Sequence, residues 1–179
     1  MKNFLVLATM AFALVFSSQV NAQKFNGLDK SPMDMATYPS SYKISEKVVR
    51  VTYSRPQLKG RSVAQLAPSN EVWRTGANEA SEIIFYKEVK LAGETIQPGT
   101  YSLFSIPGEK EWTIILNSKL NQWGAYTYDK DSDVARIKVT PNNDKESLEA
   151  FSISFNKVDE EVHLVMGWGK TRVSVPITL

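Results

Sequence analysis

The chain has 179 residues, 21 of them Lys or Arg, 19 Asp or Glu, one His and none Cys, and its formal net charge is +2. A charge this close to neutral argues against a protein that binds nucleic acid through a basic surface, and 42% hydrophobic residues are too many for a disordered chain. Without Cys, the chain has no disulfides, thiolate metal sites, Cys nucleophiles or iron–sulfur clusters.

The first 22 residues have the pattern of a secretory signal peptide. Lys2 precedes an apolar run from Phe4 to Phe16, and small residues follow as far as Ala22, so cleavage is expected before Gln23. The apolar run is shorter than the roughly 20 residues that a membrane-spanning helix needs. We therefore expect an exported protein, periplasmic, cell-surface or secreted, with no membrane span.

Residues 23–46 differ in composition from the rest of the chain. They contain Ser31-Pro32, Tyr38-Pro39 and few aliphatic side chains, which predicts an extended N-terminal arm. Residues 47–179 show no repeat, low-complexity tract or change of composition. This remainder is therefore expected to fold as one domain.

From residue 47 onwards, short runs of alternating apolar and polar side chains recur about every ten positions, separated by turn residues. A period of two is typical of half-buried strands, and regularly spaced strands are typical of an antiparallel sandwich. We expect an all-β, jelly-roll-like sandwich of eight or nine strands, with Gly167-Trp168-Gly169 joining the last two. The expected strands are 49–54, 83–89, a short one near 96, 101–106, 112–117, 134–139, 151–156, 162–166 and 173–177.

Helix is expected to be scarce. Ser62 with Gln65 resembles a capping box, which predicts one short helix before Pro68. Asn143 with Glu146 has the same spacing and favours a single further turn.

The densest polar cluster runs from Trp73 to Glu79 and includes Arg74 and Asn78. Arg offers a planar fork of donors for carboxylate, phosphate or sugar hydroxyls, and Asn and Glu supply complementary groups. In the alternative, structural interpretation, Arg74 pairs with Glu79 and Asn78 bonds its own backbone. Both interpretations stay open.

A second cluster interleaves aromatic and amide side chains around Trp123 and Tyr126. If exposed, these rings form a stacking platform for sugars or bases. If buried, they pack a wide connection onto the core, and this is the arrangement we expect because Trp is usually largely buried.

Three further groups are weaker candidates. Lys170 and Arg172 follow Gly169 in a pattern that fails as a phosphate-binding loop, so they either face solvent or contribute to an anion site. Asp129, Asp131 and Asp133 have the spacing that opens a calcium loop, but Val134 and Thr140 stand where that motif needs Gly and Glu. No metal site is therefore expected, although looser calcium binding stays open. The single histidine, His163, is expected on the surface or between strands.

Several motifs of the chain are together similar to those of one family. They are Tyr53-Ser54-Arg55-Pro56, Lys59-Gly60-Arg61, Val72 to Ala80, Pro98 to Leu103 and Asn121 to Tyr126. Over residues 28–178 the chain resembles a family of exported bacterial proteins known only as a domain of unknown function. This resemblance implies an exported, mostly Gram-negative, single-domain protein, and it brings no reaction, cofactor or catalytic residue. The chain departs from the family pattern at Ala64-Gln65 and Pro68-Ser69-Asn70.

We expect a non-catalytic binding or accessory module of the bacterial envelope, without a cofactor, whose partner is a polar or anionic small molecule, a glycan or an envelope protein. One alternative is a hydrolase of envelope polymers that uses Glu79 as general acid or base tuned by Arg74. Another is a structural subunit that pairs through exposed edge strands. The candidate binding residues are Trp73, Arg74, Asn78, Glu79, Trp123, Tyr126, Lys170 and Arg172.

Overall fold

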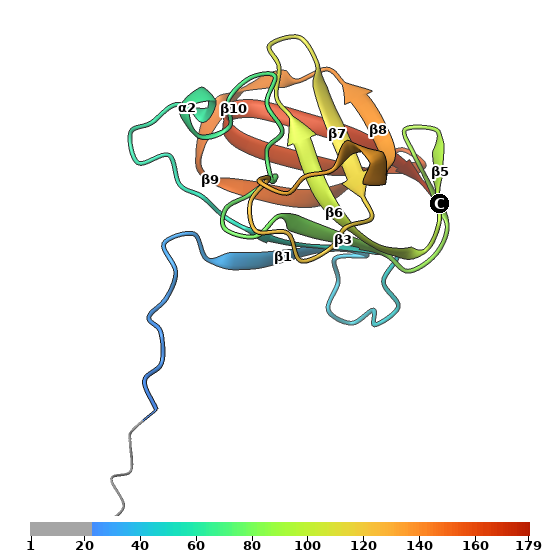
Figure 1. Cartoon of the computed structure of the whole chain (residues 1–179). Coiled ribbons are helices and arrows are strands. Elements are labelled where there is room, and N and C mark those ends of the chain that lie inside the picture. The colour runs from blue at the N-terminus through green and yellow to red at the C-terminus, as the bar shows by residue number, and fades with distance from the viewer. Residues whose placement is uncertain (1–22) are drawn as a thin grey trace, which may run out of the picture.

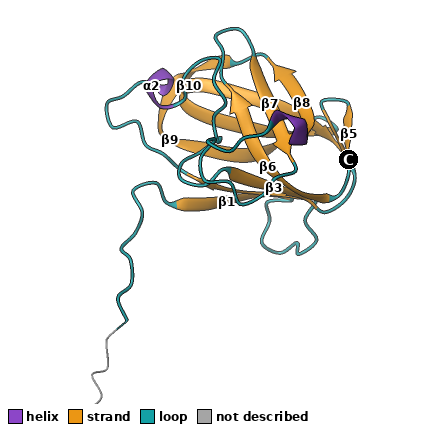
Figure 2. Cartoon of the chain, in the orientation of Figure 1, coloured by secondary structure: helices purple, strands orange, loops and turns teal. Residues whose placement is uncertain are grey.

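The computed structural model describes residues 23–179, so the expected signal peptide of residues 1–22 lies outside the described residues. Strands dominate the described chain and form two antiparallel sheets (Figure 1). Between residues 23 and 179, helix is limited to two short turns, α2 (Val63–Leu66) and η1 (Lys130–Ser132) (Figure 2). The all-β sandwich predicted from the period of two is therefore confirmed.

The larger sheet has six strands in the order β1-β2-β3-β6-β7-β8. Its neighbours follow chain order once β4 and β5 are left out, so this sheet is a meander and lacks the alternation between sheets that is typical of a jelly roll. Along β2, Val49, Val51 and Tyr53 are buried while Arg50 and Thr52 lie on the outer face. The strands are β1 (Met33–Tyr38), β2 (Val49–Ser54), β3 (Ser81–Phe85), β6 (Gly99–Ile106), β7 (Trp112–Asn117) and β8 (Asp133–Val139).

The smaller sheet has the order β5-β4-β10-β9. In Figure 1 its long orange and red strands, β9 and β10, lie behind β6 and β7 of the larger sheet. Its strands are β4 (Val89–Leu91), β5 (Glu94–Ile96), β9 (Asn142–Val158) and β10 (Glu161–Thr178).

The last element, β10, doubles back on itself. Its 18 residues would span about 60 Å if they were straight, yet the Thr178 hydroxyl donates to the Glu161 carboxylate at 3.3 Å. Nδ1 of His163 likewise lies 2.8 Å from Oγ of Ser174. The chain reverses near Gly169, whose φ of 53° is in the left-handed region. The turn expected between the last two runs lies here, and His163 faces a residue on the returning arm.

The core between the sheets is centred on stacked and edge-packed aromatic rings. Trp73 stacks on Trp168 with ring centroids 5.6 Å apart, and Phe151 meets Trp73 edge-on at 5.0 Å. Tyr53 links the sheets because its hydroxyl donates to the Ile153 carbonyl at 3.3 Å and accepts from the Ile153 N–H at 3.0 Å. Aromatic pairs of this kind contribute about 0.5–1.5 kcal/mol beyond the area they bury.

Two local expectations are corrected by the structure. Residues 33–38 were expected in the extended arm, but they form β1 at the edge of the larger sheet, paired antiparallel with β2. The helical turn expected from Asn143 and Glu146 is absent because these residues belong to β9, where Asn143 is opposite Thr171. Strand pairing outweighs local capping potential at these positions.

The other predicted helix is present. Gln65 N–H donates to Ser62 Oγ at 3.3 Å and the Gln65 side chain accepts from Ser62 N–H at 2.7 Å, which completes the capping box of α2. No helix among residues 23–179 is long and apolar enough to cross a membrane.

Candidate functional site

The two polar clusters expected from the sequence are joined in space. The N–H of Ala80 donates to the carbonyl of Gln122 at 2.8 Å, and the N–H of Gly124 donates to the carbonyl of Asn78 at 2.9 Å. These two bonds make a short antiparallel ladder between the segment before β3 and the loop after β7. Chain positions more than forty residues apart therefore build one surface.

Glu79 and Trp123 are the pair between those two bonds. In an antiparallel ladder such a non-hydrogen-bonded pair has its side chains close together on one face. Glu79 is exposed, Trp123 is 61% exposed, and Tyr126 in the same loop is 81% exposed. The expectation that this aromatic cluster packs on the core is therefore wrong for both rings, and they are free to contact a ligand.

Trp73 and Arg74 are divided between core and surface. Trp73 is only 6% exposed, and its indole N–H donates to the Gly76 carbonyl at 3.1 Å. Arg74, the next residue, is half-buried and lines a hollow of about 290 Å³. We call it the Arg74 hollow, because among the described residues Arg74 is the only charged side chain that lines it. The lining consists of Leu66, Pro68, Val72, Trp73, Arg74, Ala125 and Tyr126.

The guanidinium of Arg74 is incompletely satisfied. Within residues 23–179, no carboxylate lies at salt-bridge distance from it, and its buried Nε has no hydrogen-bond partner. The ion pair with Glu79, one of the two interpretations open from the sequence, is therefore absent. A buried N–H left without a partner costs about 1–3 kcal/mol, and no acceptor within residues 23–179 offsets this cost.

The backbone on each side of Arg74 is fixed by hydrogen bonds. Trp73 exchanges two backbone bonds with Ser105 of β6, at 2.7 and 2.9 Å. Thr75 is fully buried with a φ of 50°, its hydroxyl lies 2.9 Å from the Ser105 hydroxyl, and its carbonyl accepts from Ser81 Oγ at 2.7 Å. A non-glycine residue persists at positive φ only where its surroundings hold it, and this anchoring aims Arg74 outwards.

Gly124 brings Tyr126 and Arg74 together. A Cβ at this position would lie 2.7 Å from Cε2 of Tyr126 and 3.4 Å from Nη1 of Arg74, and φ is +70°. Both side chains therefore occupy the space next to the glycine. No other residue fits this position without displacing the Tyr126 ring.

The loop that carries these aromatics is locked at its far end. The Tyr128 hydroxyl donates to Asp133 at 2.6 Å and accepts from Arg136 at 2.8 Å, while Asn117 donates to the other Asp133 oxygen at 2.8 Å. Burial, and then the hydrogen bond to Asp133, raise the pKa of Tyr128 to about 12. The Tyr128 ring also packs on Phe104 with centroids 5.2 Å apart. The loop is thus held on the outer face of the larger sheet.

Asn78 and Glu79 lie apart from the Arg74 hollow. The Ser31 N–H and then the Asn78 side chain hold the pKa of Asp29, in the N-terminal arm, below its ordinary value. Glu79 lines a second hollow together with Glu82 and Asn121. Neither Glu82 nor Asn121 is among the candidate binding residues chosen from the sequence, although the alternation of β3 places Glu82 on the outer face.

Lys170 and Arg172 do not line the Arg74 hollow. Arg172 donates to the carbonyls of Gly169 at 2.9 Å and Glu146 at 2.8 Å and pairs with Asp144 at 3.3 Å. Arg172 therefore links the reversal of β10 to β9 through these bonds. Lys170 is exposed on that reversal.

The acidic turn has no free set of ligands for a metal. Asp129 accepts from Lys119 at 2.7 Å and from Ser132 at 3.1 Å, and one oxygen of Asp133 is shared by Tyr128 and Arg136. Among residues 23–179, no three His, Cys, Asp or Glu side chains are grouped to hold a metal ion.

The fold and the site define an all-β sandwich that presents loop-borne hollows on the outer face of one sheet. The chain belongs to the family described as "Protein of unknown function (DUF2911)", which matches residues 31–177. The resemblance seen in the motifs is therefore confirmed at the level of the family. Searches of the curated proteins and of the solved structures found no match.

Proposed function

We propose that the protein is a non-catalytic binding module that takes a carboxylate- or phosphate-bearing ligand in the Arg74 hollow. The observation that carries the proposal is the buried Nε of Arg74, which lacks a hydrogen-bond partner in the described chain. Carboxylate and phosphate oxygens are the acceptors that match a guanidinium fork. Because Arg74 is the only charged residue of the lining, no protein carboxylate there competes with the ligand.

The rest of the hollow favours a ligand with a flat or apolar body. Leu66, Pro68, Val72 and Ala125 provide apolar walls, and Tyr126 offers an exposed ring. Aromatic side chains stack on the apolar faces of planar groups and sugar rings. An acidic sugar or a sugar phosphate combines the required anion with such a face.

Three sugars with the same pyranose ring, one with a carboxylate, one with a phosphate and one uncharged, test which anion the hollow binds. We expect D-glucuronate or glucose 6-phosphate to bind and glucose, which lacks the anion, to bind at least tenfold more weakly in a calorimetric titration. A hydrogen bond to a charged group contributes about 1.5–3 kcal/mol, so Arg74→Ala should weaken binding of the anionic probe about ten- to hundredfold. Equal binding of all three probes would contradict the proposal.

Arg61→Ala is the matched control. Arg61 is an exposed arginine whose donors go to the carbonyls of Leu58 and Gln57, and it lies outside the Arg74 hollow. Its loss removes the same positive charge from the surface without touching the hollow. Equal losses in Arg61→Ala and Arg74→Ala would show nonspecific attraction instead of a site.

A hydrolase is not the function we propose. That alternative needed Arg74 beside Glu79 to tune the carboxyl, whereas the two residues line different hollows. We propose that the binding module lies in the envelope of a bacterium, because residues 1–22 have the pattern of a signal peptide for export. Fractionation of expressing cells and N-terminal sequencing test this, and a mature chain that begins at Gln23 is the expected result.

A further inference from the structure

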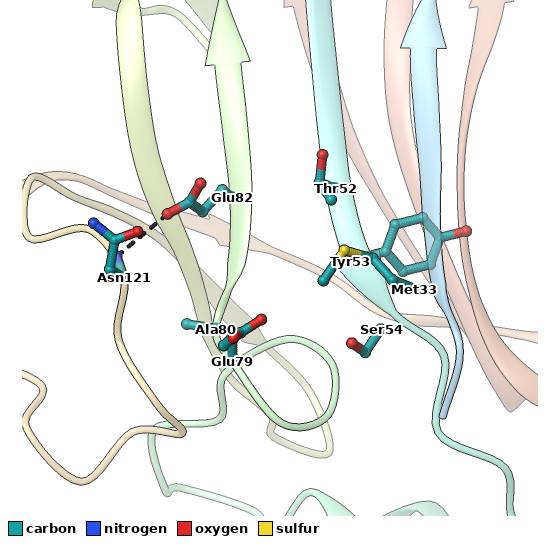
Figure 3. A pocket seen from close by; sticks show the side chains of 8 residues that line it. All are labelled: Met33, Thr52, Tyr53, Ser54, Glu79, Ala80, Glu82 and Asn121. Carbon is teal, nitrogen blue, oxygen red and sulfur yellow. Dashed lines mark hydrogen bonds between the residues drawn. The ribbon is translucent and has the colours of Figure 1, made fainter. Parts of the chain in front are cut away.

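A second hollow, of about 200 Å³, opens beside Glu79 near the ends of β2 and β3. Figure 3 shows its walls, with β1 and β2 on one side and β3 and the loop after β7 on the other. Its lining consists of Met33, Thr52, Tyr53, Ser54, Glu79, Ala80, Glu82 and Asn121. We call it the Glu79 hollow.

Strand register builds this hollow on the outer face of the larger sheet. Met33 is opposite Ser54 in the β1–β2 pair, and Thr52 is opposite Glu82 in the β2–β3 pair. Opposite residues in an antiparallel pair share a face. Asn121 closes the far side, where its backbone N–H donates to Glu82 Oε1 at 3.3 Å (Figure 3).

The Glu79 hollow carries negative charge without compensation. Glu79 and Glu82 both line it, and none of the Lys, Arg or His residues from 23 to 179 does. In the described part of the chain, neither glutamate forms a salt bridge. Two uncompensated carboxylates on one concave surface attract a cation.

Ser54 provides an uncharged polar group in the lining of the hollow, independent of the two carboxylates. It is only 4% exposed, and its hydroxyl forms no hydrogen bond with any residue from 23 to 179. The residue lines the hollow, and in Figure 3 its hydroxyl points to the side on which Glu79 lies. The Ser54 Oγ itself is not sealed from solvent, so the open space of the hollow reaches it and it is available to a ligand.

We infer that the Glu79 hollow binds a primary ammonium group, as a second ligand site that does not depend on the Arg74 site. An ammonium presents three N–H donors, and Glu79, Glu82 and Ser54 supply three acceptors around the hollow. Met33 covers the carbon stem of the amine, and the exposed Trp123 indole stands beside Glu79 at the rim. Aromatic faces attract such cations.

Titration with n-butylammonium, with n-butanol as the neutral probe of the same shape, tests the inference at neutral pH. Trp123 reports binding by fluorescence, since the other three tryptophans are 6% exposed or less. We expect saturable binding of the amine and none of the alcohol. Equal responses to both probes would show an apolar hollow and overturn the inference.

Charge-removing variants locate the site. Glu79→Gln and Glu82→Gln should each weaken amine binding at least tenfold, and Ser54→Ala should weaken it severalfold. Glu94→Gln, at an exposed glutamate of β5, is the matched control and should change nothing. Because Glu79 is exposed, Glu79→Gln keeps the test valid if the variants at the more buried positions fold poorly. Equal losses in Glu94→Gln and Glu79→Gln would show bulk charge attraction and overturn the site.

Two further titrations distinguish the ammonium site from the Arg74 hollow and from a metal site. Arg74→Ala should bind butylammonium as the wild type does, so that failure of the Arg74 proposal leaves this one standing. Calcium should not displace the amine, because Ca²⁺ needs about six to eight oxygen ligands. Displacement of the amine by micromolar calcium would show a metal site instead.

Discussion

Trp73 and Trp168 stack with their planes 14° apart at the point where β10 reverses. Trp112, on β7 of the larger sheet, meets Trp73 edge-on, and their ring centroids are 6.3 Å apart. The stack therefore ties the segment that carries Arg74 to both sheets. Binding residues on loops are most effective when a rigid scaffold positions them, and this cluster is that scaffold.

Trp73→Ala should lower the free energy of unfolding by about 3–5 kcal/mol, the usual loss for a large aromatic side chain removed from a core. Trp123→Ala, at a ring that is 61% exposed, should change it by less than about 0.5 kcal/mol. Urea denaturation followed by circular dichroism measures both values. Similar losses in the two variants would show that the exposed ring belongs to the core.

The alternation of apolar and polar residues was sufficient to predict the two sheets. It did not predict which of the candidate binding residues lie in the core and which lie on the surface. Successive residues of an extended segment face opposite sides, which separates the buried Trp73 ring from the half-buried Arg74 side chain. The sequence did not show that Trp73 pairs with Ser105, because this contact joins the segment to β6 across about thirty residues. Lys170 and Arg172 lie outside the Arg74 hollow because of another contact between distant segments, since the reversal of β10 gives Arg172 carbonyl partners of its own.

Gly124→Ala should weaken binding of an anionic probe at the Arg74 hollow by at least tenfold. The new methyl group would meet the Tyr126 ring and the Arg74 guanidinium, and one or both must move. Gly60→Ala is the control, because Gly60 has a similar φ of +79° but open space around it. Both variants should lose about 1–2 kcal/mol of stability from the left-handed backbone. Loss of binding in Gly60→Ala as well would remove the specific role of Gly124.

The burial of Tyr128, together with its hydrogen bond to Asp133, should make stability fall at high pH. The pKa of Tyr128 is raised from 10.0 to about 12 in the folded chain, so between pH 10 and 12 the unfolded chain loses this proton while the folded chain keeps it. Stability decreases with pH where the folded state holds more protons. The difference in unfolding free energy between the wild type and Tyr128→Phe should therefore be constant below pH 10 and should shrink from pH 10 to 12. A difference that stays constant across that window would contradict the environment assigned to Tyr128.

The exposure of Trp123 was also not predictable from the sequence. An aromatic residue in a loop is usually buried, and the opposite outcome here follows from the ladder between Asn78 and Gly124. That ladder places Trp123 beside Glu79 on the outer side. The capping box of α2 was predictable because its two partners, Ser62 and Gln65, lie within four residues of each other. The two hollows were not, because they depend on contacts between distant segments.

The most direct test of the central claim is the Nε–H resonance of Arg74 in a nitrogen-15 correlation spectrum. Nε is buried and has no hydrogen-bond partner in the described chain, so its N–H resonance should respond when D-glucuronate or glucose 6-phosphate pairs with the guanidinium. We expect this resonance to shift downfield saturably with at least one of these anions and to stay in place with glucose. An Arg74 Nε–H that is unmoved while either anion saturates resonances elsewhere would contradict the account.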